Sequence, residues 1–300
     1  MSTVYEIITD RIVGLLEQGT VPWRRPWAGG EEYAPRNGQT RHRYRGVNVF
    51  LLSAMGYESP CWLTFKQIKA LGAMIRKGER STPVIFWKWL ERAADTDADD
   101  LAAAESDNGK SAVKRFPMLR YYNVWSADQC DGLPADRFAL PDVPTYPVNP
   151  IESCERIVRD MPKRPDIRHG QPRAYYDRAG DFVNMPKRER FQQASGYYSV
   201  VFPELAHATG HESRLNRRFG CRFGDSTYAR EELVAEMGAA FLCGNAGIET
   251  QTIDNSAAYV RTWIDRLRGD SKLAVIAAAQ AQKATDFILD VDRGAERKVA

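Results

Sequence analysis

A proline-dense stretch near the middle of the chain constrains its fold more than any other sequence feature. Within LPADRFALPDVPTYPVNPIES, proline stands at positions 134, 141, 144, 147 and 150. Because proline fixes φ and stiffens an extended backbone, this composition is typical of a linker. The 300 residues also exceed the usual size of one hydrophobic core. The sequence therefore predicts two domains, residues 1–133 and 151–300, joined by a proline-rich linker over 134–150.

Hydrophobic periodicity predicts the secondary structure on both sides of this linker. Apolar residues at helical spacing indicate helices, and alternating β-branched and aromatic residues indicate strands. Before the linker we expect helices over 4–16 and 64–71 and strands over 83–91 and 119–129. Beyond it we expect a helix over 151–160, short strands near 174–176 and 181–183, and then mainly helices. The predicted fold class is α+β, with a mixed α/β N-terminal domain and a mainly helical C-terminal domain that carries a small sheet.

An acidic stretch without aromatic residues separates the two strands expected before the linker. It reads RAADTDADDLAAAESDNGKSAV and occupies positions 92–113. A segment with so little apolar surface cannot contribute much to a core, so we interpret it as a solvated insertion in a hairpin.

Composition excludes several classes of protein. No run of about 18 apolar residues is present that could cross a bilayer. Glu6, Asp10 and Glu17 interrupt the apolar positions of the N-terminus, which is unlike a signal peptide. The five cysteines are widely scattered and never spaced as CxxC, which argues against a disulfide framework and against a cysteine zinc site. We therefore expect a cytoplasmic protein with reduced thiols and no membrane partner.

Basic and aromatic residues concentrate before the linker, although the formal net charge of the chain is only +3. Residues 24–80 contain eleven basic and four acidic residues, and six of the seven tryptophans precede the linker. Cations that contact phosphates, interleaved with rings on which bases stack, suit single-stranded nucleic acid. Individual tryptophans, such as Trp87 and Trp89 on one strand face, could equally belong to the core. The predicted DNA-binding residues are Arg24, Arg25, Arg41, Arg43, Tyr44, Arg45, Trp62, Lys66 and Lys77.

The order of several motifs before the linker resembles a known family. The succession PWRRPW, RYRGVN, CWLTFKQI, KGERSTPV and YYNVW is similar to the N-terminal domain of ArdC-type antirestriction proteins, a domain that also resembles the amino-terminal part of plasmid-encoded TraC primases. This resemblance extends over roughly residues 1–130. It implies binding to single-stranded DNA without sequence preference.

Two of the four histidines, His207 and His211, are four residues apart in PELAHATGHESRLNR. On a helix this spacing places both imidazoles on one face, where they can bind a common ion. The helix expected over 228–242 carries Glu232 and Glu236 one turn apart, and either could supply a third ligand. Such a histidine pair could equally be a surface or capping pair, so the residues alone leave a metal site as one of two interpretations. If an ion binds, one divalent metal, zinc, is expected.

The same segments resemble the zincin-like metallopeptidase domain of the ArdC family. The resemblance implies that Glu204 is the general base, that His207 is the second histidine of HExxH, and that Glu232 is the third ligand. Pro203 stands where the family has its first histidine, so a complete HExxH is absent. Either His211 replaces the missing ligand, or the site has lost its metal. If His211 replaces it, the ion moves by about one helical turn, ~5 Å, away from Glu204, and Glu236 or Glu212 could serve as base.

The family resemblance implies a role in protecting incoming conjugative plasmid DNA from host restriction while that DNA is single-stranded. Two hypotheses follow for the C-terminal domain. In the first, the chain is a DNA-binding antirestriction protein whose metallopeptidase-like domain is structural. In the second, it is a DNA-targeted metalloprotease that cleaves a host protein, such as a restriction-modification subunit. The substitution at Pro203 favours the first hypothesis.

Overall fold

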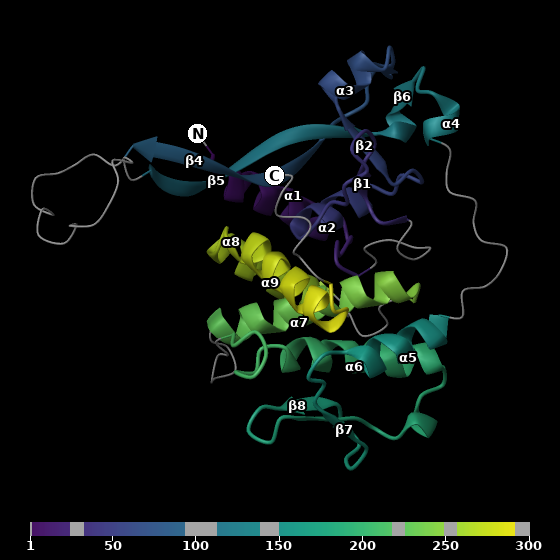
Figure 1. The fold of residues 1–300 in the computed structure, drawn as a ribbon, viewed down its shortest axis with the longest axis vertical. Helices are drawn as coiled ribbons and strands as arrows, with labels where there is room; N and C mark the ends of the chain where they lie inside the picture. The colour runs from purple at the N-terminus through teal and green to yellow at the C-terminus, as the bar shows by residue number, and fades with distance from the viewer. Residues whose placement is uncertain are drawn as a thin grey trace, which may run out of the picture.

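The computed structural model describes residues 2–24, 33–93, 113–138, 150–217, 226–248 and 257–291 (Figure 1). An N-terminal half, residues 2–138, is built around a twisted sheet. It lies over a C-terminal half, residues 150–291, that consists mainly of helices and carries a small sheet at the far end of the molecule (Figure 1). This architecture confirms the predicted α+β fold class.

Helix α1 (Val4–Glu17) opens the chain and begins at a capping box. The Thr3 hydroxyl accepts the Glu6 backbone N–H, and the Glu6 carboxylate accepts the Thr3 N–H at 2.7 Å. These reciprocal bonds satisfy backbone donors that a helix N-terminus otherwise leaves without partners. The buried face of α1 includes Ile8, Ile12 and Leu16.

The main sheet of the N-terminal half has the strand order β1-β2-β5-β4. Its two long strands, β4 (Thr82–Ala93) and β5 (Val113–Ser126), form an antiparallel hairpin in continuous register from Thr82↔Val124 to Ala93↔Val113. Two small hydrophobic clusters pack against this sheet. One contains Trp62, Val84 and Val124, and the other contains Leu63 and Ile68. The two sides of the sheet therefore pack on different elements.

The remaining elements of the N-terminal half are short and surround this sheet. Its helices are α2 (Val47–Ser53), α3 (Phe65–Ala70), α4 (Ala135–Phe138) and the 3₁₀ turn η2 (Ala127–Gln129). Its other strands are β1 (Arg36–Asn37), β2 (Cys61–Thr64), β3 (Met74–Ile75) and β6 (Cys130–Asp131).

In the C-terminal half, helix α7 (Ser226–Ala246) occupies the centre and packs against α6 (Ala194–Ala208) on one side and α9 (Leu273–Ile288) on the other. It is buried on several faces, which is typical of a helix in the middle of a bundle. The outer helices are α5 (Pro150–Asp160), α8 (Ala257–Gly269) and the turn η3 (Arg188–Arg190). The small sheet has the order β7-β9-β8, with β7 (Asp166–Arg168), β8 (Tyr175–Asp177) and β9 (Phe182–Asn184).

A single hydrophobic core joins the two halves. Helices α1 and α2 contribute buried residues to the same cluster as α7, α8 and α9. At its centre the rings of Phe50 and Phe241 stack with their centroids 4.6 Å apart. Trp23 packs edge-on against Trp263 with the centroids 6.1 Å apart. The halves are therefore not independent in their packing, although they differ in fold.

The predicted linker and the acidic insertion fall largely outside the described residues. Residues 139–149 and 94–112 are not described, so the boundaries at 133 and 151 stay predictions. Within the ranges that the structure does describe, no helix is long and apolar enough to cross a membrane.

Candidate metal centre and nucleic-acid interface

Helices α6 and α7 lie against each other, and histidine and glutamate side chains from these helices line one pocket. The pocket has a volume of about 350 Å³. Glu204 and His207 come from α6, and Glu231 and Glu232 come from α7. The strand β8 forms the facing wall through Tyr175 and Tyr176. These elements gather three of the residues predicted for the metal site, namely Glu204, His207 and Glu232.

The His207 ring is held between two carboxylates of α7. Its Nδ1 lies 3.4 Å from the Glu231 Oε1, and its Nε2 lies 3.9 Å from the Glu232 Oε1. Buried Arg217 donates from Nη2 to Glu231 at 2.7 Å and from Nε at 3.1 Å. Because Glu231 is committed to Arg217 and to one edge of the ring, it orients His207 so that Nε2 faces Glu232 and the pocket.

Burial and neighbouring charges shift the pKa of Glu204, His207 and Glu231 in this pocket. Desolvation raises the pKa of Glu204, and the nearby carboxylate of Glu232 adds to this effect against the attraction of His207. Desolvation opposes the protonated form of His207, but the carboxylates of Glu231, Glu204 and Glu232 raise its pKa above the ordinary value. Burial alone would raise the pKa of Glu231, yet its hydrogen bonds with His207 and Arg217 lower it.

His211 does not share a helical face with His207, and this corrects the geometry expected from their spacing. Helix α6 ends at Ala208, and His211 lies in the following turn. Its Nδ1 lies 2.8 Å from the Ser213 hydroxyl and 3.9 Å from Asp181. Across the described ranges, no group of three His, Cys, Asp or Glu side chains is arranged to hold a metal ion. The structure therefore does not bring His211 together with His207 and Glu232.

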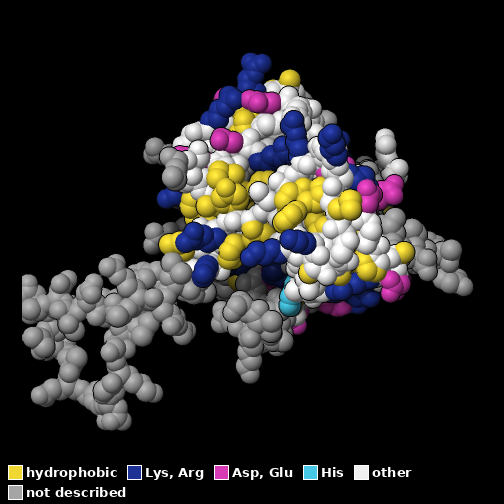
Figure 2. Space-filling model, turned by 90° about the horizontal axis from the view of Figure 1, so that it is seen from above, with side chains coloured by type: hydrophobic (Ala, Val, Ile, Leu, Met, Phe, Trp, Pro, Cys, Tyr) yellow, Lys and Arg dark blue, Asp and Glu magenta, His cyan; other side chains and the backbone are white. Residues whose placement is uncertain are grey.

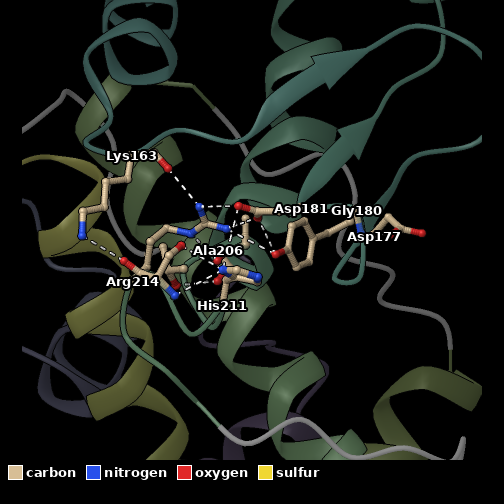
Figure 3. Close-up of polar contacts among 11 residues, drawn as sticks. Lys163, Asp177, Gly180, Asp181, Ala206, His211 and Arg214 are labelled. Atoms are coloured by element: carbon tan, nitrogen blue, oxygen red, sulfur yellow. Dashed lines mark hydrogen bonds and ion pairs between the residues drawn. The ribbon is translucent and has the colours of Figure 1, made fainter.

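A buried guanidinium fixes the turn that contains His211 (Figure 3). The Arg214 side chain is only 1% exposed and donates to the carbonyls of Ala208 at 2.7 Å and Lys163 at 2.9 Å. It also pairs with Asp181 and donates to the Tyr176 hydroxyl at 3.2 Å. Arg214 thus connects the end of α6 to β8, which forms the wall of the pocket. Sequence reasoning missed this residue, because its partners lie up to 51 positions away.

The other candidate for a third ligand, Glu236, points away from the pocket. The Trp23 Nε1 donates to its carboxylate at 3.1 Å, and the Tyr259 hydroxyl donates at 2.5 Å. Glu212, the alternative base, is exposed and does not line the pocket. Pro203 lies one turn before His207 in the continuous helix α6, and its ring offers no donor to a metal.

The structure distributes the predicted DNA-binding residues over several places. Arg41, Arg43, Tyr44 and Arg45 line a common groove beside α9. Arg24, Lys66 and Lys77 are exposed but do not line that groove, and Arg25 lies outside the described residues. Trp62 is 2% exposed and packs in the sheet core. Its burial corrects the prediction that Trp62 stacks on bases, because no face of the ring is accessible.

Exposed rings occur instead on the hairpin of β4 and β5. Trp87 is 50% exposed, Tyr121 is 45% exposed and Phe86 is 39% exposed. The signal for this was present in the sequence, since Phe86 and Trp87 are consecutive and must point to opposite faces of a strand. Figure 2 shows the face of the N-terminal half, where hydrophobic side chains alternate with those of lysine and arginine and few acids lie between them. We use the name hairpin surface for the exposed side chains of this hairpin, namely Phe86, Trp87, Lys88, Arg120 and Tyr121.

The sequence matches two protein families, one for each half. Residues 2–125 match the family described as the N-terminal domain of the anti-restriction factor ArdC. Residues 152–281 match the family described as zincin-like metallopeptidase. Two solved structures of the antirestriction protein ArdC from the R388 plasmid are similar to the whole fold. The metal-free structure has a TM-score of 0.72 and 37% sequence identity, and the match covers 96% of this chain and 97% of the ArdC chain. The Mn(II)-bound structure has a TM-score of 0.73 and 35% identity, with 96% and 98% covered.

Two curated proteins are similar over nearly the whole chain. DNA primase TraC of Escherichia coli is 36% identical over 95% of this chain, which spans only 27% of the primase. The uncharacterized protein y4eC of Sinorhizobium fredii is 34% identical over 98% of this chain and 94% of its own length. The chain thus corresponds to the full length of one relative and to about a quarter of the other.

Proposed function

Since the chain belongs to the ArdC family of antirestriction proteins, we propose that it binds single-stranded DNA without sequence preference and protects incoming conjugative plasmid DNA from host restriction. The observation that carries this proposal is the hairpin surface, where the exposed rings of Phe86, Trp87 and Tyr121 lie on the same two strands as exposed Lys88 and Arg120. Stacking on such rings requires bases that are not paired in a duplex, and arginine and lysine neutralise the phosphates. The site of action is the cytoplasm of the recipient cell.

Direct binding tests this function. The purified chain is titrated into a fluorescent dT oligonucleotide, a mixed-sequence single strand and a duplex, and anisotropy is measured at increasing salt. We expect both single strands to bind with similar affinity and more tightly than the duplex. The affinity should fall steeply with salt because counterions are released on binding. Equal affinity for the duplex would contradict the proposal.

A charge-reversal variant links binding to protection. Arg43 is exposed, so Arg43→Glu should weaken binding to every single strand by a similar factor. Arg190→Glu reverses an exposed charge in the C-terminal half and serves as the matched control. In conjugation into a restriction-proficient recipient, plasmid transfer should fall with Arg43→Glu and stay unchanged with Arg190→Glu. Equal transfer with both variants would separate DNA binding from protection.

The C-terminal pocket supports a divalent cation held by His207 and Glu232. Their 3.9 Å separation is close to the distance between two donors that share one ion. Among the described residues no third protein ligand joins them, because Pro203 occupies the position of the family's first histidine and His211 lies 3.9 Å from Asp181. An imidazole and a carboxylate suit zinc, which would polarise a bound carbonyl or water. Since two ligands are fewer than hydrolytic zinc sites use, we propose that the cation is bound weakly and that the site is not an efficient peptidase.

The second candidate function is a metalloprotease directed to a host restriction-modification protein by bound DNA. The position of Glu204 favours it, since this carboxyl is buried in the same pocket as His207 and Glu232. Incubating the purified chain with restriction subunits in the presence of single-stranded DNA and zinc tests it. Cleavage that Glu204→Gln abolishes would support this function, and intact subunits would contradict it.

A further inference from the structure

A groove runs between the hairpin of β4 and β5 and the helix α9, with the start of α2 as its floor. Its volume is about 620 Å³. The N-terminal half contributes Tyr44, Phe86, Trp87 and Tyr122, and α9 contributes Val275, Ala279, Gln282 and Lys283. The two walls therefore come from different halves of the chain.

The groove combines rings, cations and an absence of acids. Trp87, one of the aromatic residues that line it, is 50% exposed, so part of its ring is accessible. The cations along it are Arg43, Lys283 and Arg45, the last of which is paired with Asp286, and none of the described residues that line it is Asp or Glu. Lys283 is exposed and takes part in no ion pair with another described residue. This charge suits a polyanion with stackable bases.

Contacts across the junction of the two halves hold the groove in shape. The Gln282 side chain accepts the Gly46 backbone N–H at 3.1 Å. Arg45 forms an ion pair with Asp286, whose side chain is 7% exposed. Gly46 has φ of 58°, a left-handed conformation that favours glycine. Because side-chain and backbone contacts both cross this junction, the groove is formed before any ligand binds.

From these observations we propose that single-stranded DNA lies in this groove, with α9 of the metallopeptidase-like half as one wall and Lys283 as a phosphate contact. This inference rests on the proposed DNA-binding function and adds to it the path of the strand. It means that the C-terminal half takes part directly in DNA binding. The pocket of His207 and Glu232 shares no lining residue with the groove, so the strand and the cation occupy separate sites.

The test uses the full chain and a dT oligonucleotide in anisotropy titrations. Lys283→Glu should weaken binding about tenfold or more, and Lys283→Ala should weaken it less while lowering the slope of log affinity against log salt by about 0.7. Lys187→Glu makes the same change in net charge at an exposed site of the C-terminal half that is away from the groove, and it should bind like the parent. Trp87→Ala, on the opposite wall, should weaken binding about tenfold.

Each outcome decides between the strand path and the function. If the parent chain fails to bind the oligonucleotide, both the proposed function and the proposed DNA path in the groove are wrong. If the parent binds and Arg43→Glu weakens binding, but Lys283→Glu behaves like Lys187→Glu, the function stands and the path along α9 is wrong. A dT oligonucleotide with 4-thiothymidine gives a second measurement, because irradiation should crosslink it to peptides of α9. Crosslinks confined to residues 1–138 would also overturn the groove.

Discussion

At the scale of single residues, Glu236 shows how burial changes a side chain that looks like a metal ligand. It lies one turn from Glu232 on α7 but is hydrogen-bonded by Trp23 and Tyr259 rather than by the pocket. Burial raises its pKa to about 7, against the opposing effect of these hydrogen bonds. Spacing alone could not distinguish Glu232 from Glu236, because the partners that separate them lie far away in the sequence.

This shift predicts how stability depends on pH. The native carboxyl of Glu236 stays protonated up to about pH 7, whereas the unfolded one ionises near 4.5. Between these values the native state binds more protons, so this contribution is complete below pH 4.5 and is lost as the pH rises to 7. The loss should be about 3 kcal/mol. In urea unfolding from pH 5 to 8, Glu236→Gln should remove this part of the decline, because glutamine keeps an acceptor and never ionises. Glu212→Gln, an exposed control, should keep the decline of the parent.

Pro203 and Glu232 allow a test of the metal site. Measured by inductively coupled plasma mass spectrometry after dialysis against zinc, Glu232→Gln should hold less metal than the parent, and Glu236→Gln should hold the same amount. Pro203→His should hold more, since histidine at 203 lies one turn from His207 and adds the missing ligand. It also restores a backbone N–H inside α6. If parent and Pro203→His held equally little zinc, the missing histidine would not explain the weak site.

At the scale of elements, the end of α6 determined that His207 and His211 do not lie on one helical face. The sequence predicted the helix but not its end at Ala208, although Gly210 between the two histidines is a common stop signal. The strands β4 and β5 were predicted because their aromatic and β-branched residues dominate any other signal. The short strands expected near 174–176 and 181–183 correspond to β8 and β9. No local pattern reveals the buried guanidinium of Arg214, because its partners lie in other segments of the chain.

Arg214 therefore provides an element-scale prediction. Arg214→Met removes the donors to Ala208, Lys163, Asp181 and Tyr176 while keeping the volume of the side chain. We expect the free energy of unfolding to fall by about 2–4 kcal/mol, because buried acceptors lose their partner. Arg159→Met breaks an ion pair whose partners are 69% and 55% exposed, so it should leave the free energy of unfolding nearly unchanged. Similar losses in the two variants, measured by urea unfolding, would contradict the role of Arg214.

At the scale of the whole molecule, composition predicted two parts but not the core that they share. The proline-rich stretch suggested a stiff, extended linker between separate domains. Instead, α1 and α2 pack into the same core as α7, α8 and α9. Such packing is invisible to local periodicity, because an apolar face shows that a helix is covered and not which element covers it.

The shared core predicts that the halves do not fold separately. A fragment of residues 1–133 would expose Ile8, Ile12, Leu16 and Phe50, which are at most 1% exposed in the full chain. We expect this fragment to bind a hydrophobic dye and to unfold without a cooperative transition, whereas the full chain unfolds in one step. Circular dichroism on heating measures both. A sharp transition of the fragment would show that the N-terminal sheet is stable without α7 to α9.

The contact between Phe50 and Phe241 also limits how recombination can exchange the two halves between relatives. A recombination event that joined the first half of one relative to the second half of another would bring together two surfaces that had never been selected to fit. Most such hybrids would be too unstable to persist, whatever activity they carried. We therefore expect recombination to transfer the two halves together. Consistent with this, TraC primase matches both halves within one continuous region of a longer chain.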